Sequence, residues 1–459
     1  MTTEFSITAV NAVLPLLGEK RLNFGKPSGT ASYSTILVGR NGSGKSTILR
    51  ELAMAMRSYF PDDPPRSRHG RGSISQIEVS SEGESATLNL LSDVQRYQFE
   101  REALRSRKIG PSKVIALSFM QHDKFPPDES RRKDSRTTSK AFYVNLGAKS
   151  AFQNSPRARL MRSIEHLADA HAEPQSDERI IQAFEAIDYL PEIKISYTFG
   201  PKKTININDP DYAYLESLIE ELKNYVKMRS QPSSDDPFYV IDFANNRHDW
   251  SIPMEYGKLR TLMRAGVLRV SSVMLRKRDG EPVELLELSS GELNLLSGFL
   301  GLAAHLTDGS VILIDEPENS LHPDWQVKYV GMLEAVLNKH QGCHYIIATH
   351  SPLIVSGVAS SHSTVLRLDQ EPIEVNADAV SDASPDATLL NAFSVVTAGN
   401  NFIKHLVLEA FTFIETGNPR GERPREIANF LAKFQSKIPE NDPLRELVGN
   451  VVLAIQGTE

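Results

Sequence analysis

The hydrophobic positions of this chain form two kinds of pattern, short continuous runs and helical repeats. A continuous apolar run that ends at a glycine or a polar residue is typical of a strand buried inside a parallel sheet. Repeats at spacings of three and four border these runs and predict helices at Ser46–Met56 and Leu293–Ala304. The runs that predict buried strands are Thr35–Val38, Val114–Gln121, Val311–Ile314 and Tyr345–Thr349.

Alternating apolar and polar residues mark a second group of strands near the start of the chain. Such alternation fits strands that bury one face, and these usually pair in antiparallel sheets. We therefore expect antiparallel strands that flank the central sheet, at Phe5–Val10, Arg21–Phe24, Ile74–Val79 and Ala86–Leu91.

Helical spacing dominates two further regions, a long insertion between the buried runs and the C-terminal end of the chain. Together the patterns predict an α/β fold with a mixed central sheet, a helical insertion and a helical C-terminal region. The insertion has no sustained heptads, which excludes a long coiled coil. The predicted helices are Ala151–Ala172, Asp177–Ile187, Tyr212–Met228, Asp386–Val396, Phe402–Thr416, Arg423–Phe434 and Asp442–Ile455.

These patterns divide the chain into four parts. Residues 1–125 form an N-terminal lobe, and residues 126–281 form a mainly helical insertion. Residues 282–375 form a C-terminal lobe, and residues 376–459 form a helical C-terminal region. We expect the two lobes to share the central sheet, because each contributes buried strands to it.

Charge and cysteine content narrow the class of protein. The net charge of −7 argues against a surface that attracts nucleic acid everywhere. The single cysteine, Cys343, excludes an internal disulfide and fits a reducing cytoplasm. No apolar run approaches the roughly 20 residues of a membrane helix, and the first residues lack the pattern of a signal peptide. We therefore expect a cytoplasmic protein without a membrane partner.

One segment is basic enough to leave a contact with DNA open. Residues 101–140 hold eleven Lys and Arg against five Asp and Glu, a local charge of +6, and include Arg131, Lys133 and Arg136. Few aromatic residues interleave these charges, as stacking on bases would require. A solvated loop is therefore the plainer interpretation, and DNA binding is the alternative.

The strongest chemical signal follows the first buried run. In the pattern G-x-x-x-x-G-K-[ST], glycines let backbone N–H groups turn toward a phosphate beside a positive helix N-terminus. The lysine reaches the β and γ oxygens, and the hydroxyl after it ligates Mg²⁺. The chain carries this pattern between a predicted strand and a predicted helix, which predicts binding of a nucleoside triphosphate. The residues are Gly39, Arg40, Asn41, Gly42, Ser43, Gly44, Lys45, Ser46 and Thr47, with Lys45 on the phosphates and Ser46 on the metal.

Later strands end in residues that predict catalysis. Open α/β sheets hold their ligands at the carboxyl ends of the strands. Asp315 and Glu316 follow one buried run, so we expect Asp315 to hold Mg²⁺ and Glu316 to polarise the attacking water. His350 follows the next run and is placed to contact the γ-phosphate. Lys45, Glu316 and His350 are thus the predicted catalytic residues.

A short polar motif precedes the predicted helix at Leu293–Ala304. Small residues before a helix leave its first N–H groups free, which makes a second anion-binding helix start. The motif is Leu288-Ser-Ser-Gly-Glu292, and the residues expected to contact nucleotide are Ser289, Ser290, Gly291 and Glu292.

The order of these motifs resembles that of the ABC-type P-loop ATPases, and more narrowly their soluble branch with the SMC-like repair ATPases, RecF and the OLD-like ATPases. The resemblance implies ATP and Mg²⁺ as ligands. It also implies that each motif has a named role. Residues 39–47 are the Walker A loop, Leu288–Glu292 the signature motif, Val311–Glu316 Walker B, Asn319–Pro323 the D-loop and His350 the switch histidine.

Two points of the resemblance are less regular. The family requires a glutamine at the end of a strand that contacts the metal, and Gln121 is our choice for it, although Asp123 lies close by. The signature departs from the usual LSGGQ at Ser290 and Glu292. Glu292 adds a negative charge where a phosphate is expected.

Within this branch the chain resembles the Septu ATPases (PtuA), including retron-associated versions, with the PARIS ATPases (AriA) a near second. The resemblance rests on Asp315–Pro323, Pro111–Phe119 and Asp123–Pro126. It implies a homodimer or higher homo-oligomer joined head-to-tail through the ATP sites. It also implies a role in anti-phage defence with a separate effector, an HNH nuclease or a Toprim-like toxin. A DNA-repair ATPase of the RecF or SMC-like kind is the alternative.

Overall fold

The fold is described from a computed structural model of the chain. The described residues are 4–25, 31–61, 72–91, 94–120, 123–127, 141–147, 156–170, 177–199, 212–228, 238–244, 247–250, 256–337, 340–358, 362–371 and 373–457.

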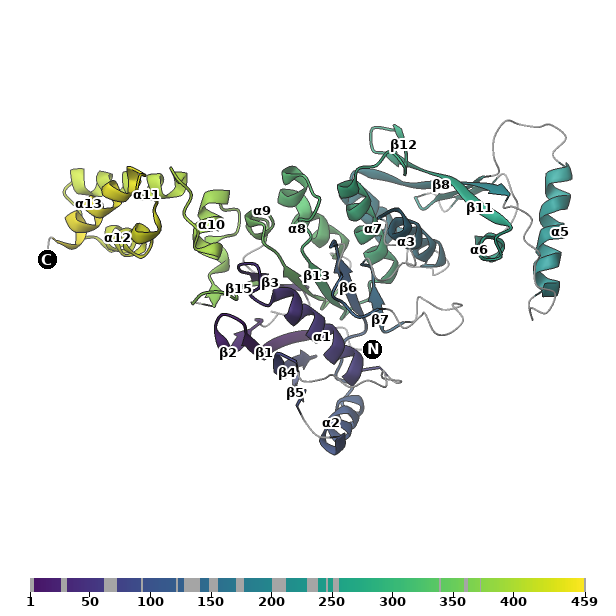
Figure 1. The fold of residues 1–459 in the computed structure, drawn as a ribbon, viewed down its shortest axis with the longest axis horizontal. Helices are drawn as coiled ribbons and strands as arrows, with labels where there is room; N and C mark the ends of the chain where they lie inside the picture. Colours follow the sequence, from purple (N-terminus) through teal and green to yellow (C-terminus); the bar gives the residue numbers. More distant parts are fainter. Residues whose placement is uncertain are drawn as a thin grey trace.

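A seven-stranded sheet forms the centre of the molecule (Figure 1). Its strand order is β16-β15-β3-β14-β13-β6-β7, and all neighbours are parallel except β15 and β16. The four continuous apolar runs form β3, β14, β13 and β6, whose residues are all buried, so this prediction is confirmed. The strands are β3 (Tyr33–Val38), β6 (Val114–Ser118), β7 (Tyr143–Asn145), β13 (Val311–Asp315), β14 (His344–Ala348), β15 (Ser363–Arg367) and β16 (Glu374–Val375).

Alternate residues of the central strands pack into two separate cores, one on each face of the sheet. Leu37 and Leu313 pack with helix α1 (Lys45–Tyr59), whereas Ile36 and Ile312 pack with helices α7 (Ser290–His305) and α8 (Pro323–Leu337). Side chains alternate across a strand, so neighbouring residues of β3 necessarily serve opposite faces. The helices α1 and α7 therefore lie on opposite faces of the same sheet.

The predicted antiparallel strands form a four-stranded sheet in the order β2-β1-β4-β5. Its apolar residues, including Val10 and Ile77, share a core with α1. Helix α2 (Val94–Ser106) follows this sheet (Figure 1). The strands are β1 (Ser6–Leu14), β2 (Gly18–Asn23), β4 (Ile74–Ser81) and β5 (Glu84–Asn89).

The insertion contains the predicted helices and also a sheet that we did not expect. Five antiparallel strands lie in the order β10-β9-β8-β11-β12. In β8 (Tyr189–Phe199), Ile193, Ile195 and Tyr197 are buried at alternate positions. This period of two is typical of a strand, whereas we predicted only helices in the insertion. The other strands are β9 (Phe238–Asp242), β10 (Arg247–Trp250), β11 (Leu268–Lys277) and β12 (Pro282–Glu284), and the helices are α3 (Pro156–Ala170), α4 (Asp177–Ala186), α5 (Tyr212–Met228) and α6 (Tyr256–Arg264).

The C-terminal region is helical, as predicted. Side chains cap two of its helices, because Ser384 Oγ accepts from the N–H of Ala387 and Asn400 Oδ1 accepts from the N–H of Ile403. None of the helices that the structure describes combines the length and apolar character needed to cross a bilayer. The helices are α10 (Pro385–Phe393), α11 (Asn401–Glu415), α12 (Glu422–Phe434) and α13 (Leu444–Gln456), with short 3-10 turns η5 (Ala377–Ala379) and η6 (Gln435–Lys437).

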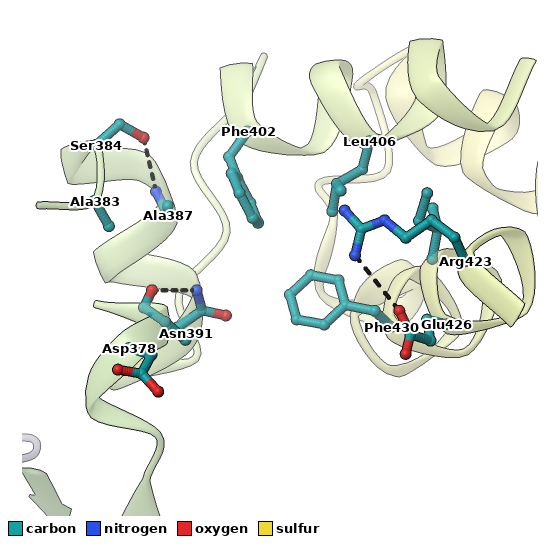
Figure 2. Close-up of a pocket in the computed structure, with 12 residues that line it drawn as sticks. Asp378, Ala383, Ser384, Ala387, Asn391, Phe402, Leu406, Arg423, Glu426 and Phe430 are labelled. Carbon is teal, nitrogen blue, oxygen red and sulfur yellow. Dashed lines mark hydrogen bonds and ion pairs between the residues drawn. The ribbon is translucent and has the colours of Figure 1, made fainter. Parts of the chain in front are cut away.

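A cleft of about 620 Å³ separates α10 from the helices that follow it. Figure 2 shows Asn391 of α10 on one side and the rings of Phe402 and Phe430 on the other. Arg423 Nη1 forms an ion pair with Glu426 Oε2 at 3.5 Å at the edge of this cleft. Helices α11 to α13 have an apolar core of their own, to which α10 contributes one leucine, Leu390.

Candidate nucleotide site

The loop between β3 and α1 has the backbone geometry of a phosphate-binding loop. Gly39, Gly42 and Gly44 adopt φ values of 146°, 81° and 101°, a region that residues with a side chain rarely adopt. A Cβ atom on Gly44 would lie 3.1 Å from Cδ of Pro15, so the loop also packs closely against the β1–β2 turn. The sequence pattern therefore has a structural reason at each of these glycines.

Lys45 lies beneath this loop. Its Nζ donates to the carbonyl oxygens of Gly39 at 2.8 Å and Arg40 at 3.2 Å, and the residue is 4% exposed. Burial lowers the pKa of Lys45 to about 8, although Glu316 and other nearby carboxylates oppose this shift. An ammonium held by two neutral carbonyls is available to exchange them for phosphate oxygens, which bind it more strongly.

Asp315 and Ser46 face each other across the base of the loop. Asp315 ends β13 and is 1% exposed, and burial raises its pKa to about 6, while a hydrogen bond from Ser46 lowers it. Its Oδ1 atom has no hydrogen-bond partner among the described residues. A buried carboxylate oxygen without a partner fits a cation, and Mg²⁺ takes one or two protein oxygens together with phosphate oxygens and water. Ser46 and Asp315, two of the three residues predicted to hold Mg²⁺, thus fit that ion.

His350 lies between Lys45 and Glu316. Its Nδ1 lies 3.4 Å from Lys45 Nζ, and its Nε2 lies 3.7 Å from Glu316 Oε1. Burial and the Lys45 charge lower the pKa of His350 to about 4, so the ring is neutral at pH 7. The structure therefore brings together the three residues that we predicted as catalytic.

Glu316 has an unusual backbone. Its φ is 48°, in the left-handed region, and its N–H donates to the carbonyl of Ala348 at 2.9 Å. For a residue other than glycine this conformation costs about 1–2 kcal/mol. The hydrogen bond to β14 holds the residue there, and the side chain reaches toward His350.

Two acidic residues belong to this cluster that the sequence analysis did not assign. Glu318 accepts a hydrogen bond from the N–H of His350, and burial raises its pKa. Asp369 follows β15 and accepts from the N–H of Arg40 at 3.0 Å, and its side chain is 2% exposed. Both hold the backbone of a predicted site residue. The sequence gives only a weak signal for Asp369, because β15 contains Ser363, Thr364 and Arg367 and the acid follows two residues after the strand ends.

The predicted signature motif forms the N-terminal cap of α7. Ser289 Oγ accepts from the N–H of Glu292 at 3.2 Å, and the Glu292 carboxylate accepts from the N–H of Ser289 at 2.9 Å. This reciprocal capping box gives Glu292 a structural role at the helix start, which a glutamine, as in the usual signature, would also fill. Ser290 is exposed and Gly291 is buried.

Gly291 also fixes the distance between the signature and the D-loop. A Cβ atom at this position would lie 2.4 Å from the backbone oxygen of Ser320, so only glycine fits. Ser320 itself has a φ of 68°, and Asn319 Nδ2 donates to the carbonyl of Phe119 at 3.4 Å. The start of α7 and the D-loop are therefore in direct contact at Gly291 and Ser320.

These residues form two groups, and among the described residues no hydrogen bond or ion pair joins Ser289, Ser290 or Glu292 to the Lys45 group. Lys45, Asp315, Glu316 and His350 gather where α1 begins, whereas the signature motif begins α7 on the other face of the sheet. In Figure 1, α1 and α7 are well separated. The first group can hold a triphosphate and a metal and activate water, and the second offers a helix N-terminus to an anion.

Some of the predicted residues lie outside the described part of the chain or have a different role. Gln121 and the basic residues Arg131, Lys133 and Arg136 lie outside the described residues. Asp123 is buried and accepts from Asn145 Nδ2 at 3.0 Å, so it ties the segment after β6 to β7.

The described arginines of the basic segment contact their own protein. Arg101 and Arg105 donate to the carbonyl of Pro61, and Arg107 donates to Glu84 at 2.8 Å. These contacts hold α2 against the segment that follows α1 and against β5. The described part of the segment thus has a structural role.

Comparison with known families identifies the chain. Residues 34–356 match the family described as "AAA domain, putative AbiEii toxin, Type IV TA system". The chain belongs to this family. As a member of an AAA-domain family it is a nucleotide-binding ATPase, and the match spans both groups of candidate residues as well as the insertion between them.

Similar curated proteins come from bacteria and a phage. The AAA-domain protein is 22% identical over 400 residues to "Retron Vc95 probable ATPase" of Vibrio cholerae serotype O1 biovar El Tor, covering 77% of this chain and 72% of the relative. It is 22% identical over 384 residues to "Retron Ec83 probable ATPase" of Escherichia coli, covering 74% and 68%. It is 22% identical to "Protein ea59" of Escherichia phage lambda, covering 74% and 49%.

Solved structures resemble this chain with low TM-scores. The SMC head domain from Thermotoga maritima has a TM-score of 0.32 and 11% identity, covering 79% of this chain and 94% of that one. The subunit cbiO1 from Clostridium perfringens has a TM-score of 0.29 and 12% identity, covering 82% and 90%. Scores this low support no argument about function.

Proposed function

We propose that the protein is the ATP-binding and ATP-hydrolysing subunit of a bacterial anti-phage defence system. In this proposal two copies associate head-to-tail when ATP binds, and the assembly holds or regulates a separate nuclease or toxin. The names of the retron relatives and of the toxin–antitoxin family support the defence role. The separation of the two groups of candidate residues supports the dimer.

The division of the site is the observation that carries the proposal. Asp315 ends β13 beside the phosphate loop, which leads into α1 on one face of the sheet, whereas Ser290 begins α7 on the other face. A single copy therefore leaves one side of a bound triphosphate without the signature motif. Docking a second copy head-to-tail would supply Ser290 and the N–H of Gly291 to the γ-phosphate, and ATP would bridge the copies.

Each residue of the phosphate group has a role in this proposal. Lys45 binds the β and γ oxygens, and Glu316 takes a proton from the attacking water. The neutral His350 donates or accepts a hydrogen bond at the γ-phosphate and lies within reach of Glu316. Ser46 and Asp315 hold Mg²⁺, which neutralises the charge that develops on the phosphates.

The dimer is tested by measuring the mass of the protein in solution. We expect a monomer without nucleotide and a dimer with ATP and Mg²⁺ when Glu316→Gln blocks hydrolysis. A matched sample of Lys45→Ala should stay monomeric with ATP. An ATP-loaded Glu316→Gln protein that remains a monomer would contradict the head-to-tail assembly.

The defence role is tested by co-purification with the product of the neighbouring gene, with and without ATP. A stable complex of fixed stoichiometry with a nuclease or toxin is the expected result. A chain that ignores this neighbour and binds DNA ends instead would favour the DNA-repair alternative. The described arginines of the basic segment, which contact Pro61 and Glu84, favour the first outcome.

A further inference from the structure

Three buried polar contacts join α3, the first described helix of the insertion, to the signature helix α7. All six residues in them are less than a tenth exposed. Their neighbours on α3, Leu160, Ile164 and Leu167, are fully buried and apolar. The contacts are Arg159 Nη2 to Asn294 Oδ1 at 2.7 Å, Ser163 Oγ to the carbonyl of Ser297 at 2.8 Å, and His305 Nε2 to His166 Nδ1 at 2.7 Å.

Arg159 is the costliest of these residues to bury. Burial lowers the pKa of its guanidinium, and the charge of Asp123 opposes this shift. Its Nε atom has no hydrogen-bond partner among the described residues. Packing alone would be served equally well by an apolar side chain, since replacing buried charged groups by apolar ones is often neutral or stabilising. A buried guanidinium at this position therefore indicates a function beyond packing.

The same guanidinium also holds the strand next to Walker B. Arg159 Nη1 donates to the carbonyl of Ser118 at 3.2 Å, and Ser118 is the last residue of β6. Ser118 pairs with Asp315 in the sheet, and the N–H of Phe119 donates to the carbonyl of Asp315 at 3.4 Å. Arg159 is thus connected, through the backbone of Ser118 and Phe119, to the backbone of Asp315, the residue whose carboxylate is predicted to hold the metal.

We propose that Arg159 is a positioning residue that fixes the N-terminal part of α7, at Asn294, against the end of β6. One side chain then links the insertion, the signature helix and the strand beside Asp315. A partner that displaces the insertion would move Asn294 and the Ser118 carbonyl together. The ATP site would respond without direct contact to the partner. This inference rests on the proposed function of the ATP site.

Two further contacts join α3 to α7 on the C-terminal side of Arg159. Gly301 of α7 lets Ser163 approach, because a Cβ atom there would lie 3.1 Å from Ser163 Oγ. Further along both helices, the imidazoles of His166 and His305 pack edge to face, with 4.5 Å between the ring centroids. Helices α3 and α7 are therefore joined at several buried positions, and Arg159 links both of them to the end of β6 by hydrogen bonds.

The test is Arg159→Met, which keeps the length of the side chain and removes its donors. We expect kcat for ATP hydrolysis to fall at least tenfold, while KM and the Kd for a fluorescent ATP analogue change less than twofold. The matched control is Arg162→Met on the same helix, which should hydrolyse ATP at the wild-type rate.

A double variant separates positioning from folding. Arg159→Met with Asn294→Leu replaces both partners of the buried contact by apolar groups, which restores stability if the single variant loses it. We expect the Tm of the double variant to return toward wild type while kcat stays low. Recovery of kcat together with Tm, or a wild-type kcat in Arg159→Met, would overturn the positioning role.

The outcome for Arg159 is distinguishable from the outcome for the dimer. If the wild-type protein hydrolyses ATP as a monomer, the proposed head-to-tail dimer is wrong. The kcat of Arg159→Met would still test the positioning role of Arg159. If the wild-type protein forms the dimer but Arg159→Met hydrolyses ATP at the wild-type kcat, the positioning role is wrong and the dimer proposal stands.

Discussion

At the scale of single residues, the environment of Lys45 predicts how nucleotide binding depends on pH. The free protein holds Lys45 with a pKa of about 8, so the ammonium loses its proton as the pH rises past 8. Phosphate favours the charged form, and ATP binding must then take up a proton. We expect affinity for ATP to weaken about tenfold between pH 7 and pH 9, because about one lysine in ten is charged one unit above its pKa.

Isothermal titration in buffers of different ionisation enthalpy measures both the affinity and the proton uptake. The control is Lys45→Arg, whose guanidinium stays charged over this range. Its affinity should be flat from pH 7 to pH 9. Wild-type affinity that is equally flat would show that Lys45 is fully charged in the free protein.

Glu316 and Glu318 provide a second comparison at this scale. Glu316→Gln removes the carboxylate predicted to take the proton, so kcat should fall roughly 100-fold to 10,000-fold with ATP still bound. Glu318→Gln keeps an oxygen that accepts from the N–H of His350, and its kcat should fall less than tenfold. Phosphate release in single-turnover reactions measures both. Equal losses in the two variants would be inconsistent with the separate roles assigned to them.

At the scale of elements, a substitution in the capping box of α7 can change the charge of the signature motif without changing the stability of the protein. Glu292→Gln keeps an acceptor for the N–H of Ser289, so the free energy of unfolding should be unchanged. It also removes a negative charge beside the expected phosphate, and the ATP-bound dimer should tighten. Ser289→Ala removes the cap and should cost about 1 kcal/mol. Chemical denaturation and dimer dissociation constants measure the two effects.

The strands and helices show what the sequence was able to predict. The buried runs and the C-terminal helices were placed within a few residues, because strong periodicity and side-chain caps determine them locally. The sheet of the insertion was missed, since β8 is bordered by helices and contains Pro191. Glu318 and Asp369 were not assigned because their role depends on which strands lie side by side. The roles of the predicted site residues remain predictions.

At the scale of the whole molecule, the division of the ATP site predicts that two inactive variants restore each other. Lys45→Ala loses the phosphate half, and Ser290→Arg blocks the signature half. In a head-to-tail pair of the two variants, one of the two sites has both halves intact. An equal mixture should therefore recover up to about half of the wild-type hydrolysis rate, since ATP joins only mixed pairs and each of these has one working site. Mixtures without activity would contradict a shared site.

The left-handed backbone at Glu316 has a consequence for how this chain can change under selection. A glycine at this position would relieve a conformational cost of about 1 kcal/mol and would end hydrolysis. A lineage that kept the protein only as a nucleotide-dependent scaffold would therefore gain stability by losing, at this residue, the carboxylate that we propose as the catalytic base. The residue at position 316 thus indicates whether selection maintains ATP hydrolysis or only nucleotide binding. A Tm of Glu316→Gly above that of the wild type would show that the left-handed backbone at Glu316 lowers the stability of the protein.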